Sequence, residues 1–282
     1  VLRDGVELNE VNIVTRKLGT MKLRSSVMNE DMISSAELSR AACCNLGESF
    51  VTNPSVDVSY SDAATGAKQI KLLGLSGTYV QMLTENIPNY RGAAAPYGLG
   101  YVPGPWMQSI QVSKGTSSVK NGYEAITGQI NVEFKKPQLP EADWVSANLF
   151  ASTTNRYEAN ADATLKLSKR WSTSLLAHYE NETKAHDGND DGFVDIPQVE
   201  QYNVWNRWAY MGDHYVFQAG IKALSETRTS GQANHGGTMH SGDLYKVGID
   251  TERYEFFTKN AYIFNKEKNT NLALILSTTL HN

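Results

Sequence analysis

An acidic stretch carries a recognisable pattern of oxygen-bearing side chains. Residues 187–195 read DGNDDGFVD, with oxygen ligands available at Asp187, Asn189, Asp191 and Asp195. Oxygen ligands at alternate positions and a glycine at a sharp turn are typical of the first part of a calcium-binding loop. The twelfth position is Gln198, where a strong site would carry a bidentate glutamate. The stretch therefore predicts either a weak calcium site or an ordinary acidic turn in an exposed loop.

A second stretch, His235–His240, gathers possible ligands for a softer metal. It offers two imidazoles and a thioether from His235, Met239 and His240, a set that suits haem or a soft transition metal. The spacing matches no standard zinc motif. A solvated loop without metal is the favoured interpretation, and the alternative stays open.

Motifs that would indicate catalysis are missing from the sequence. It contains no Gly-x-Ser-x-Gly elbow, no glycine-rich phosphate loop followed by Lys–Ser, and no His-Glu-x-x-His. We therefore expect a binding or transport protein, not an enzyme, with no required cofactor beyond the possible calcium ion.

The composition narrows the class of protein further. The 282 residues are 40 % hydrophobic, with a net charge of −4 and a pI of about 5.9. Such a chain can build a sizeable core but has no basic patch for nucleic acid. No apolar run is long enough for a transmembrane helix, and the N-terminus shows no signal-peptide pattern. Cys43 and Cys44 are adjacent, which argues against a disulfide framework and favours packing on a helix.

The candidate ligand residues lie in a chain with two regions, and the pattern of apolar and polar residues changes between them near 137–140. Before the boundary, residues 28–50 have apolar side chains at roughly helical spacing, and Gly47 is placed to end that helix. Short strand candidates separated by glycine and asparagine turns lie at 55–60, 69–73, 79–83, 110–113 and 129–133. The first region is expected to be a small domain that mixes helix and strands.

After the boundary the hydrophobic period is two. In residues 157–168 every odd position is apolar or aromatic and every even position is polar, which predicts a two-faced strand. The expected apolar face carries Ala161 and Ala163, and the polar face carries Thr164. Further strands are predicted at 144–152, 171–181, 202–210, 214–226, 254–264 and 271–281.

Two kinds of sheet fit this alternation, namely a water-soluble antiparallel sheet with one buried face and a transmembrane barrel. Candidate strands of nine to thirteen residues are long enough to cross a membrane. Short connections such as 167–170 alternate with longer ones such as 183–200. A barrel with short turns at one rim and long loops at the other requires this alternation, so the barrel is preferred.

Residues 114–137, KGTSSVKNGYEAITGQINVEFKKP, contain a lysine–glycine turn, further glycines, an Ile–Asn strand and an exit proline. This segment resembles the end of the plug domain of TonB-dependent outer-membrane receptors. The matching residues are Lys114, Gly115, Gly122, Gly128, Ile130, Asn131 and Pro137, and in the first half of the plug Leu46, Pro54, Val56, Val58, Ile70, Gly74 and Val80. Glu85–Asn86 replaces the commoner Asp–Gly turn, and Leu73 stands where many members carry arginine. These departures indicate a divergent subfamily.

The resemblance implies an architecture for the whole chain. An N-terminal segment, residues 1–20, would precede an α+β plug domain over 21–137, and antiparallel transmembrane β-barrel strands would follow over 138–282. Receptors of this kind close roughly 22 strands, so the strands here would form an incomplete part of the barrel. The stretch DGFVDIPQVEQYNVWNRW is similar to Bacteroidetes-type receptors. The protein is expected in the Gram-negative outer membrane, in contact with its lipid.

The resemblance also implies partners. The stretch EVNIVT is similar to a Ton box, which the TonB energy transducer would bind as an added strand, and it comprises Glu10, Val11, Asn12, Ile13, Val14 and Thr15. The alternative for this stretch is the first strand of the plug. Ligand contacts are expected in two loops that match the ligand-facing side of the family's plugs, at Tyr60, Asp62, Tyr90, Arg91, Tyr97, Tyr101 and Trp106. The alternative for these residues is packing within the plug.

Two functions follow from these patterns. The leading hypothesis is TonB-dependent import of a scarce ligand, such as a siderophore, haem, cobalamin or another nutrient. The second is a β-rich, calcium-dependent surface binding protein without transport. Nucleic acid is not an expected partner of either.

Overall fold

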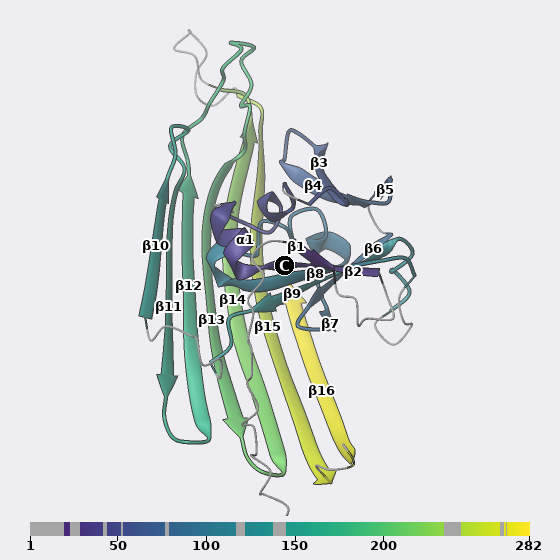
Figure 1. Ribbon diagram of the computed structural model, residues 1–282. Helices are drawn as coiled ribbons and strands as arrows, with labels where there is room; N and C mark the ends of the chain where they lie inside the picture. The colour runs from purple at the N-terminus through teal and green to yellow at the C-terminus, as the bar shows by residue number, and fades with distance from the viewer. Residues whose placement is uncertain are drawn as a thin grey trace, which may run out of the picture.

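The computed structural model consists of a small mixed domain seated against the inner face of a curved sheet of long strands (Figure 1). We call the curved sheet the wall. The described residues are 20–22, 29–41, 44–51, 53–76, 79–116, 122–137, 145–233, 244–265, 268 and 270–282.

The mixed domain is built on a six-stranded sheet with the order β1-β2-β8-β9-β6-β7. Its neighbouring strands are antiparallel except for β6 and β9, which run parallel. A separate sheet, β3-β4-β5, lies toward the end of the wall that carries the longer loops (Figure 1). The elements are β1 Thr20–Lys22, β2 Asn29–Ser34, α1 Ser35–Arg40, η1 Glu48–Phe50, β3 Val56–Asp62, β4 Ala67–Leu72, β5 Leu75–Ser76, β6 Val80–Thr84, β7 Ile87–Pro88, η2 Gly92–Ala94, η3 Gly104–Trp106, β8 Met107–Lys114 and β9 Gly128–Phe134.

The long helix predicted for residues 28–50 is wrong. Its first part forms β2, which pairs with β8 and buries Ile33 opposite Ile110. Among the described residues of this stretch, only α1 is α-helical, and its N-cap Ser34 accepts a hydrogen bond from the backbone N–H of Glu37 at 3.4 Å. Pairing with a strand distant in the sequence has overridden the local helical spacing. Cys44 therefore follows this helix and does not lie on it.

Two tight turns of the mixed domain use the left-handed region of backbone space. Glu85 and Asn86, with φ of 50° and 63°, join β6 to β7, and Leu73 and Gly74, with φ of 55° and 81°, join β4 to β5. Positive φ at both central residues is the signature of the type I′ turn that links antiparallel strands. The turn expected at Glu85–Asn86 is confirmed, although Glu85 is an uncommon residue for this conformation.

The wall contains seven antiparallel strands in sequence order. They are β10 Val145–Ala151, β11 Tyr157–Lys166, β12 Trp171–Glu182, β13 Gln198–Met211, β14 Tyr215–Gly231, β15 Lys246–Asn265 and β16 Thr270–His281. Each strand predicted from the period of two is present, and several are longer than predicted. The short connections 167–170 and 212–214 lie at one end of the wall, and the longer connections lie at the other (Figure 1).

The two faces of the wall differ in burial. Every even-numbered residue of β12 from Ser172 to Glu182 is buried. The odd-numbered residues of the same strand are half-buried or exposed. In β11, Ala161 and Ala163 are exposed and Thr164 is buried. The face assignment made from the sequence is confirmed.

Among the described residues, no helix is long and apolar enough to cross a membrane.

Aromatic rings gather at two heights on the outward face. Near the short turns, the ring of Trp171 lies 5.0 Å from Tyr210 and 6.1 Å from Phe217 between centroids. Near the other end, Tyr179 and Tyr202 lie 4.9 Å apart. Trp171 and Tyr179 share β12, and at about 3.3 Å per residue they are separated by roughly 26 Å along the strand. Barrel strands are tilted by about 35–45°, so this distance corresponds to roughly 20 Å of height, within the apolar band of about 25 Å that aromatic girdles flank.

The face assignment can be tested with Ala163→Arg. Ala163 pairs with Leu175, midway between the two aromatic groups on the outward face. A charge at this position is expected to cost about 2–4 kcal/mol in a membrane and to reduce assembly of the full-length protein. Thr164→Arg is the control and should be milder, because the inward face is polar. The heat-modifiable mobility of the protein from outer-membrane fractions measures both, and a larger loss for Thr164→Arg would contradict the assignment.

Candidate functional site

An aromatic cluster joins the mixed domain to the wall. Trp106 and Phe134 belong to the mixed domain, and Trp205 and Phe257 belong to β13 and β15. The rings of Phe134 and Trp205 meet edge to face with centroids 4.5 Å apart, and Trp205 lies 6.3 Å from both Trp106 and Phe257. Such pairs stabilise beyond the area that they bury. The cluster therefore fixes the depth at which the mixed domain sits against the wall.

Glu85 makes a deeply buried ionic contact between the two regions. One carboxylate oxygen is 2.5 Å from Nη2 of Arg207 on β13, and the other is 3.6 Å from Nζ of Lys259 on β15. The side chains of Glu85 and Arg207 are each only 3 % exposed. A carboxylate so far from water is stable only while its cations are held close. The type I′ turn that directs Glu85 at the wall therefore docks the mixed domain.

A second polar contact surrounds Tyr90. Nζ of Lys222 on β14 donates to the Tyr90 hydroxyl at 3.3 Å and to the Tyr101 carbonyl at 3.2 Å. Lys222 also pairs with Glu255 at 3.6 Å, and Asn89 donates to the same carboxylate at 2.7 Å. Burial raises the pKa of Tyr90 well above its ordinary value, and the Glu255 carboxylate adds to the effect. Tyr90 is thus a neutral hydrogen-bonding group that holds the mixed domain in place.

A cavity of about 340 Å³ lies between the mixed domain and the wall, near the longer loops. On one side it is lined by Tyr60 on β3, Lys68 on β4 and the loop around Tyr97. On the other side it is lined by inward-facing residues at the ends of the wall strands from β10 to β14. We call it the outer cavity. It is open to solvent and polar, so it is a candidate place for ligand contact.

Four polar side chains stand side by side on the wall, and the last three of them line the outer cavity. Glu158 on β11 is the cross-strand partner of Glu180 on β12, which pairs with Gln201 on β13, which pairs with Glu226 on β14. We call these four residues the acidic row. Like charges directly opposite each other destabilise a sheet. The Glu158–Glu180 pair therefore requires a cation between its carboxylates.

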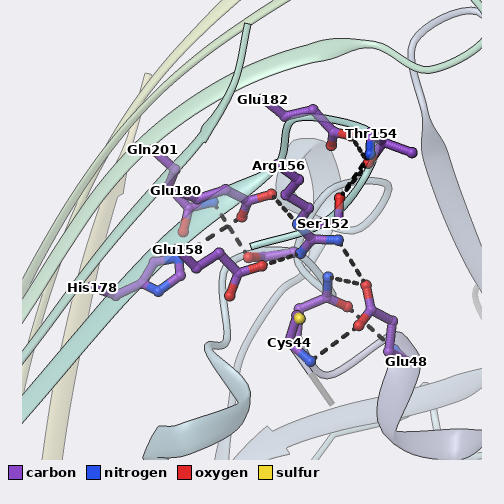
Figure 2. Close-up of polar contacts among 12 residues, drawn as sticks. Cys44, Glu48, Ser152, Thr154, Arg156, Glu158, His178, Glu180, Glu182 and Gln201 are labelled. Atoms are coloured by element: carbon purple, nitrogen blue, oxygen red, sulfur yellow. Dashed lines mark hydrogen bonds and ion pairs between the residues drawn. The ribbon is translucent and has the colours of Figure 1, made fainter. Parts of the chain in front are cut away.

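Arg156 supplies that cation (Figure 2). Its guanidinium is 2.6 Å from Glu158 and 3.2 Å from Glu180. A third nitrogen lies 2.9 Å from Glu48, which belongs to the mixed domain. One side chain thus links two strands of the wall to the mixed domain. The Arg156 guanidinium is therefore shared by three carboxylates.

Cys44 lies beside this cluster (Figure 2). Its backbone N–H donates to Oε2 of Glu48 at 3.0 Å, and its side chain is buried. Burial raises the pKa of the thiol far above its ordinary value, and the carboxylates of Glu158 and Glu48 raise it further. The thiol therefore stays protonated, which makes it a packing group and a poor nucleophile.

Three of the seven residues predicted to contact the ligand are buried and do not face a ligand site. Tyr90, Tyr101 and Trp106 are 4 %, 0 % and 0 % exposed, and they pack between the mixed domain and the wall. Burial also raises the pKa of Tyr101 to about 12, helped by the Glu226 carboxylate. The ligand contact predicted for these residues is corrected to a packing role, because their rings and hydroxyls are already enclosed.

Two further predicted residues lie at the outer cavity. Tyr60 is 59 % exposed, and its ring centroid is 5.4 Å from Nζ of Lys68. The ring of Tyr97 lies 5.2 Å from the guanidinium of Arg228 on β14. Both rings line the cavity, so the structure brings these two predicted residues together.

The remaining two predicted residues are occupied elsewhere. Asp62 closes its own turn by accepting hydrogen bonds from the Ala64 N–H at 3.1 Å and the Thr65 hydroxyl at 2.6 Å. Arg91 forms an ion pair with Glu124 at 2.7 Å. Neither residue lines the outer cavity.

The acidic loop satisfies its carboxylates locally. Asp187 accepts hydrogen bonds from the backbone N–H groups of Asp191 and Gly192 at 3.2 and 2.7 Å, and Asp195 accepts one from Gly188 at 2.7 Å. Across the part of the chain that the structure describes, no group of three or more His, Cys, Asp or Glu is arranged to hold a metal ion. Calcium binding by this loop stays a prediction.

Two sequence-based interpretations concern residues outside the described ranges. These are the Ton-box stretch, residues 10–15, and the possible metal ligands His235, Met239 and His240.

Sequence reasoning missed the wall residues that form the outer cavity. They are Arg156, Glu180, Glu182, Gln201, Glu226 and Arg228, and Glu158 is the cross-strand neighbour of Glu180. The available signal was the charge of several inward positions in strands with a period of two. A charged side chain on a face that meets another domain needs a partner there. The signal could not say which of these residues are neighbours, because that depends on strand register.

Comparison with known proteins agrees with this architecture. Residues 22–129 match the family model of the TonB-dependent Receptor Plug Domain. The chain is 24 % identical over 185 residues to the vitamin B12 transporter BtuB of Vibrio vulnificus strain CMCP6, and the match covers 66 % of this chain and 30 % of BtuB. The chain thus spans less than half of the length of this relative.

Solved receptor structures show the same fold. The alcaligin outer membrane receptor FauA from Bordetella pertussis is 12 % identical, with a TM-score of 0.66 over 92 % of this chain and 40 % of FauA. The siderophore receptor PirA from Acinetobacter baumannii is 16 % identical, with a TM-score of 0.67 over 89 % of this chain and 40 % of PirA.

The mixed domain is therefore a plug, and the wall is part of the β-barrel that surrounds it. Residues 22–129 thus match the plug domain of TonB-dependent receptors, and the chain has the fold of solved outer-membrane receptors of this kind.

The docking role of Glu85 predicts a loss of plug stability in Glu85→Ala. The substitution leaves Arg207 and Lys259 without their buried counter-charge. Breaking a buried pair in this way is expected to cost about 3–5 kcal/mol. Hydrogen exchange of plug peptides in the full-length receptor measures the change in the free energy of opening.

Asp213→Ala is the matched control for Glu85→Ala. Asp213 pairs with Arg170 at 2.9 Å, but their side chains are 68 % and 56 % exposed. Its loss should cost less than about 1 kcal/mol. Equal exchange in the two variants would show that Glu85 does not dock the plug.

Calcium binding by the acidic loop predicts protection from proteolysis. Without a glutamate at the twelfth position, the affinity should be about 10⁻⁴–10⁻³ M, and magnesium should substitute poorly because its octahedral shell is stricter. Limited proteolysis of the 183–200 loop with calcium, magnesium or chelator measures the effect, with Asp191→Ala as the comparison. Equal cleavage in all conditions would make the loop an ordinary acidic turn.

Proposed function

We propose that the full-length protein imports a scarce nutrient across the outer membrane by TonB-dependent active transport. The observation that carries this proposal is the docking of the plug on the inner face of the wall. The plug is held by an aromatic cluster and by buried polar contacts at Glu85 and Tyr90. A barrel filled in this way does not conduct passively, so import requires work on the plug.

The attachment of the N-terminal part of the plug suggests where that work is applied. The stretch at residues 10–15 precedes β1, and β1 is joined through β2 to β8 in the plug sheet. The ion pair between Asp31 and Lys114, at 2.6 Å, supports the β2–β8 pairing. A force on the N-terminal segment would therefore act first on β1 and β2, at one edge of the plug sheet.

The ligand is proposed to meet the plug at the outer cavity, where Tyr60 and Tyr97 lie near the longer loops. Relatives include a transporter of vitamin B12 and receptors for siderophores. Molecules of this kind are too large and too dilute for passive entry, so a specific receptor is needed. Siderophore, haem, cobalamin and other nutrients are the candidate ligands.

Ile13→Pro tests the energy-coupling step. Proline removes a backbone donor and fixes φ, so it blocks the addition of residues 10–15 as a strand to TonB. Uptake of labelled candidate ligands by cells that express the full-length receptor should fall to the level of cells without TonB. Ligand binding to intact cells should be unchanged. Uptake at the wild-type rate would place the coupling segment elsewhere, and uptake by wild-type receptor in the absence of TonB would refute the proposed function.

A further inference from the structure

The outer cavity carries more negative than positive charge. Four carboxylates line it, from Glu48, Glu180, Glu182 and Glu226. Three cations line it as well, from Lys68, Arg156 and Arg228. The described lining residues therefore carry one negative charge more than positive charge.

Two of the three cations are fully engaged within the protein. Arg156 is shared by three carboxylates at 2.6 to 3.2 Å. Arg228 donates twice to Oε1 of Glu226, at 3.0 and 3.2 Å, and its guanidinium lies over the ring of Tyr97. Lys68 sits on the plug side over Tyr60. None of them forms an ion pair with Glu182 on the wall side of the cavity.

Glu182 is a carboxylate with little compensation. It is 7 % exposed, and its hydrogen bond from the Thr154 hydroxyl is long, at 3.4 Å. Among the described residues, no Lys, Arg or His nitrogen forms an ion pair with it within 4.0 Å. A carboxylate this buried is expected to hold a cation or a strong donor.

Gln201 provides a second, independent sign of a missing donor. Its Nε2 donates to Glu226 at 2.7 Å and to the Gly100 carbonyl at 3.3 Å, which fixes the orientation of the amide. Its Oε1 is buried and accepts no hydrogen bond in the described structure, although the residue is only 1 % exposed. Buried polar atoms are rarely left in this state. Gln201 lines the same cavity as Glu182, one strand away.

The unmatched groups are thus an anion and a carbonyl, and both accept hydrogen bonds. We propose that this part of the outer cavity is a subsite for a positively charged group of the ligand, of the ammonium or guanidinium type. Such a group donates several N–H bonds and supplies the missing charge, as charge-assisted hydrogen bonds require. The ligand role of the subsite rests on the proposed import function.

The chemistry favours an organic cation over a bare metal ion. No set of three His, Cys, Asp or Glu in the described part of the chain is arranged to ligate a metal. Glu180 and Glu226 are already held by arginines. What remains is a cavity of about 340 Å³ that Glu182 and Gln201 both line, which leaves room for a group with several N–H donors.

Hexaamminecobalt(III) is a suitable probe, because it is a cation that offers N–H donors and exchanges its ligands slowly. The purified full-length receptor is titrated by calorimetry, and the cobalt position is found by anomalous diffraction. The expected result is cobalt in the outer cavity beside Glu182 and Gln201. Hexacyanocobaltate(III), an octahedral anion of the same metal, should not bind there.

Glu182→Gln should weaken binding by about tenfold or more, because it removes a charged acceptor while keeping the shape of the side chain. Glu200→Gln is the control, since Glu200 accepts hydrogen bonds from Tyr179 and Tyr202 on the opposite face of the wall. Cobalt absent from the cavity, the anion bound in its place, or unchanged affinity in Glu182→Gln would overturn the subsite. The titration needs no TonB, so failed import with cobalt bound refutes only the proposed function, and import without cobalt binding refutes only the subsite.

Discussion

The structure depends on one constraint, which is that a plug charge buried at the contact with the wall needs an opposite charge on the wall beside it. Glu85 illustrates it, because its carboxylate is enclosed and lies between Arg207 and Lys259 on two different strands. Removing water from a carboxylate costs several kcal/mol unless cations replace it. The position of the plug is therefore specified by matching charges as well as by the aromatic cluster around Trp205.

The same constraint explains why the wall has two chemically different faces. Inward positions must supply partners for the plug, so they carry Arg207, Lys222 and Lys259. Outward positions of β11 and β12 are mostly apolar between two groups of aromatic rings. A strand alternates its side chains with a period of two, which lets one segment meet both requirements at once. A slip of one residue would reverse every assignment, so the register is strongly specified.

Strand register also creates the outer cavity. Glu158, Glu180, Gln201 and Glu226 are neighbours only because four strands place them at one height. The positive charge of Arg156 reduces the repulsion between Glu158 and Glu180. The same guanidinium connects the wall to Glu48 of the plug. Buried charge beyond what stability requires is often found at functional sites. The side of the plug near the longer loops thus combines a link to the wall with unmatched acceptors.

The sequence by itself determined the elements that depend on local chemistry. The period of two predicted each strand of the wall and the correct face for Ala163 and Thr164, because alternation is a property of neighbouring residues. The turn at Glu85–Asn86 followed from its place in the plug pattern. The prediction from sequence was wrong at residues 28–50, because the pairing of β2 with β8 outweighs the helical spacing of the apolar residues.

Tertiary structure decided the site. Tyr60 and Tyr97 were predicted from the sequence of the plug. The burial of Tyr90, Tyr101 and Trp106 depends on the contact between plug and wall, which the sequence does not show. The acidic row joins residues up to 68 positions apart, from Glu158 to Glu226. Their proximity is set by backbone hydrogen bonding between strands, which leaves no mark in the local sequence. Charge at inward positions was visible in the sequence, but the partner of each charge was not.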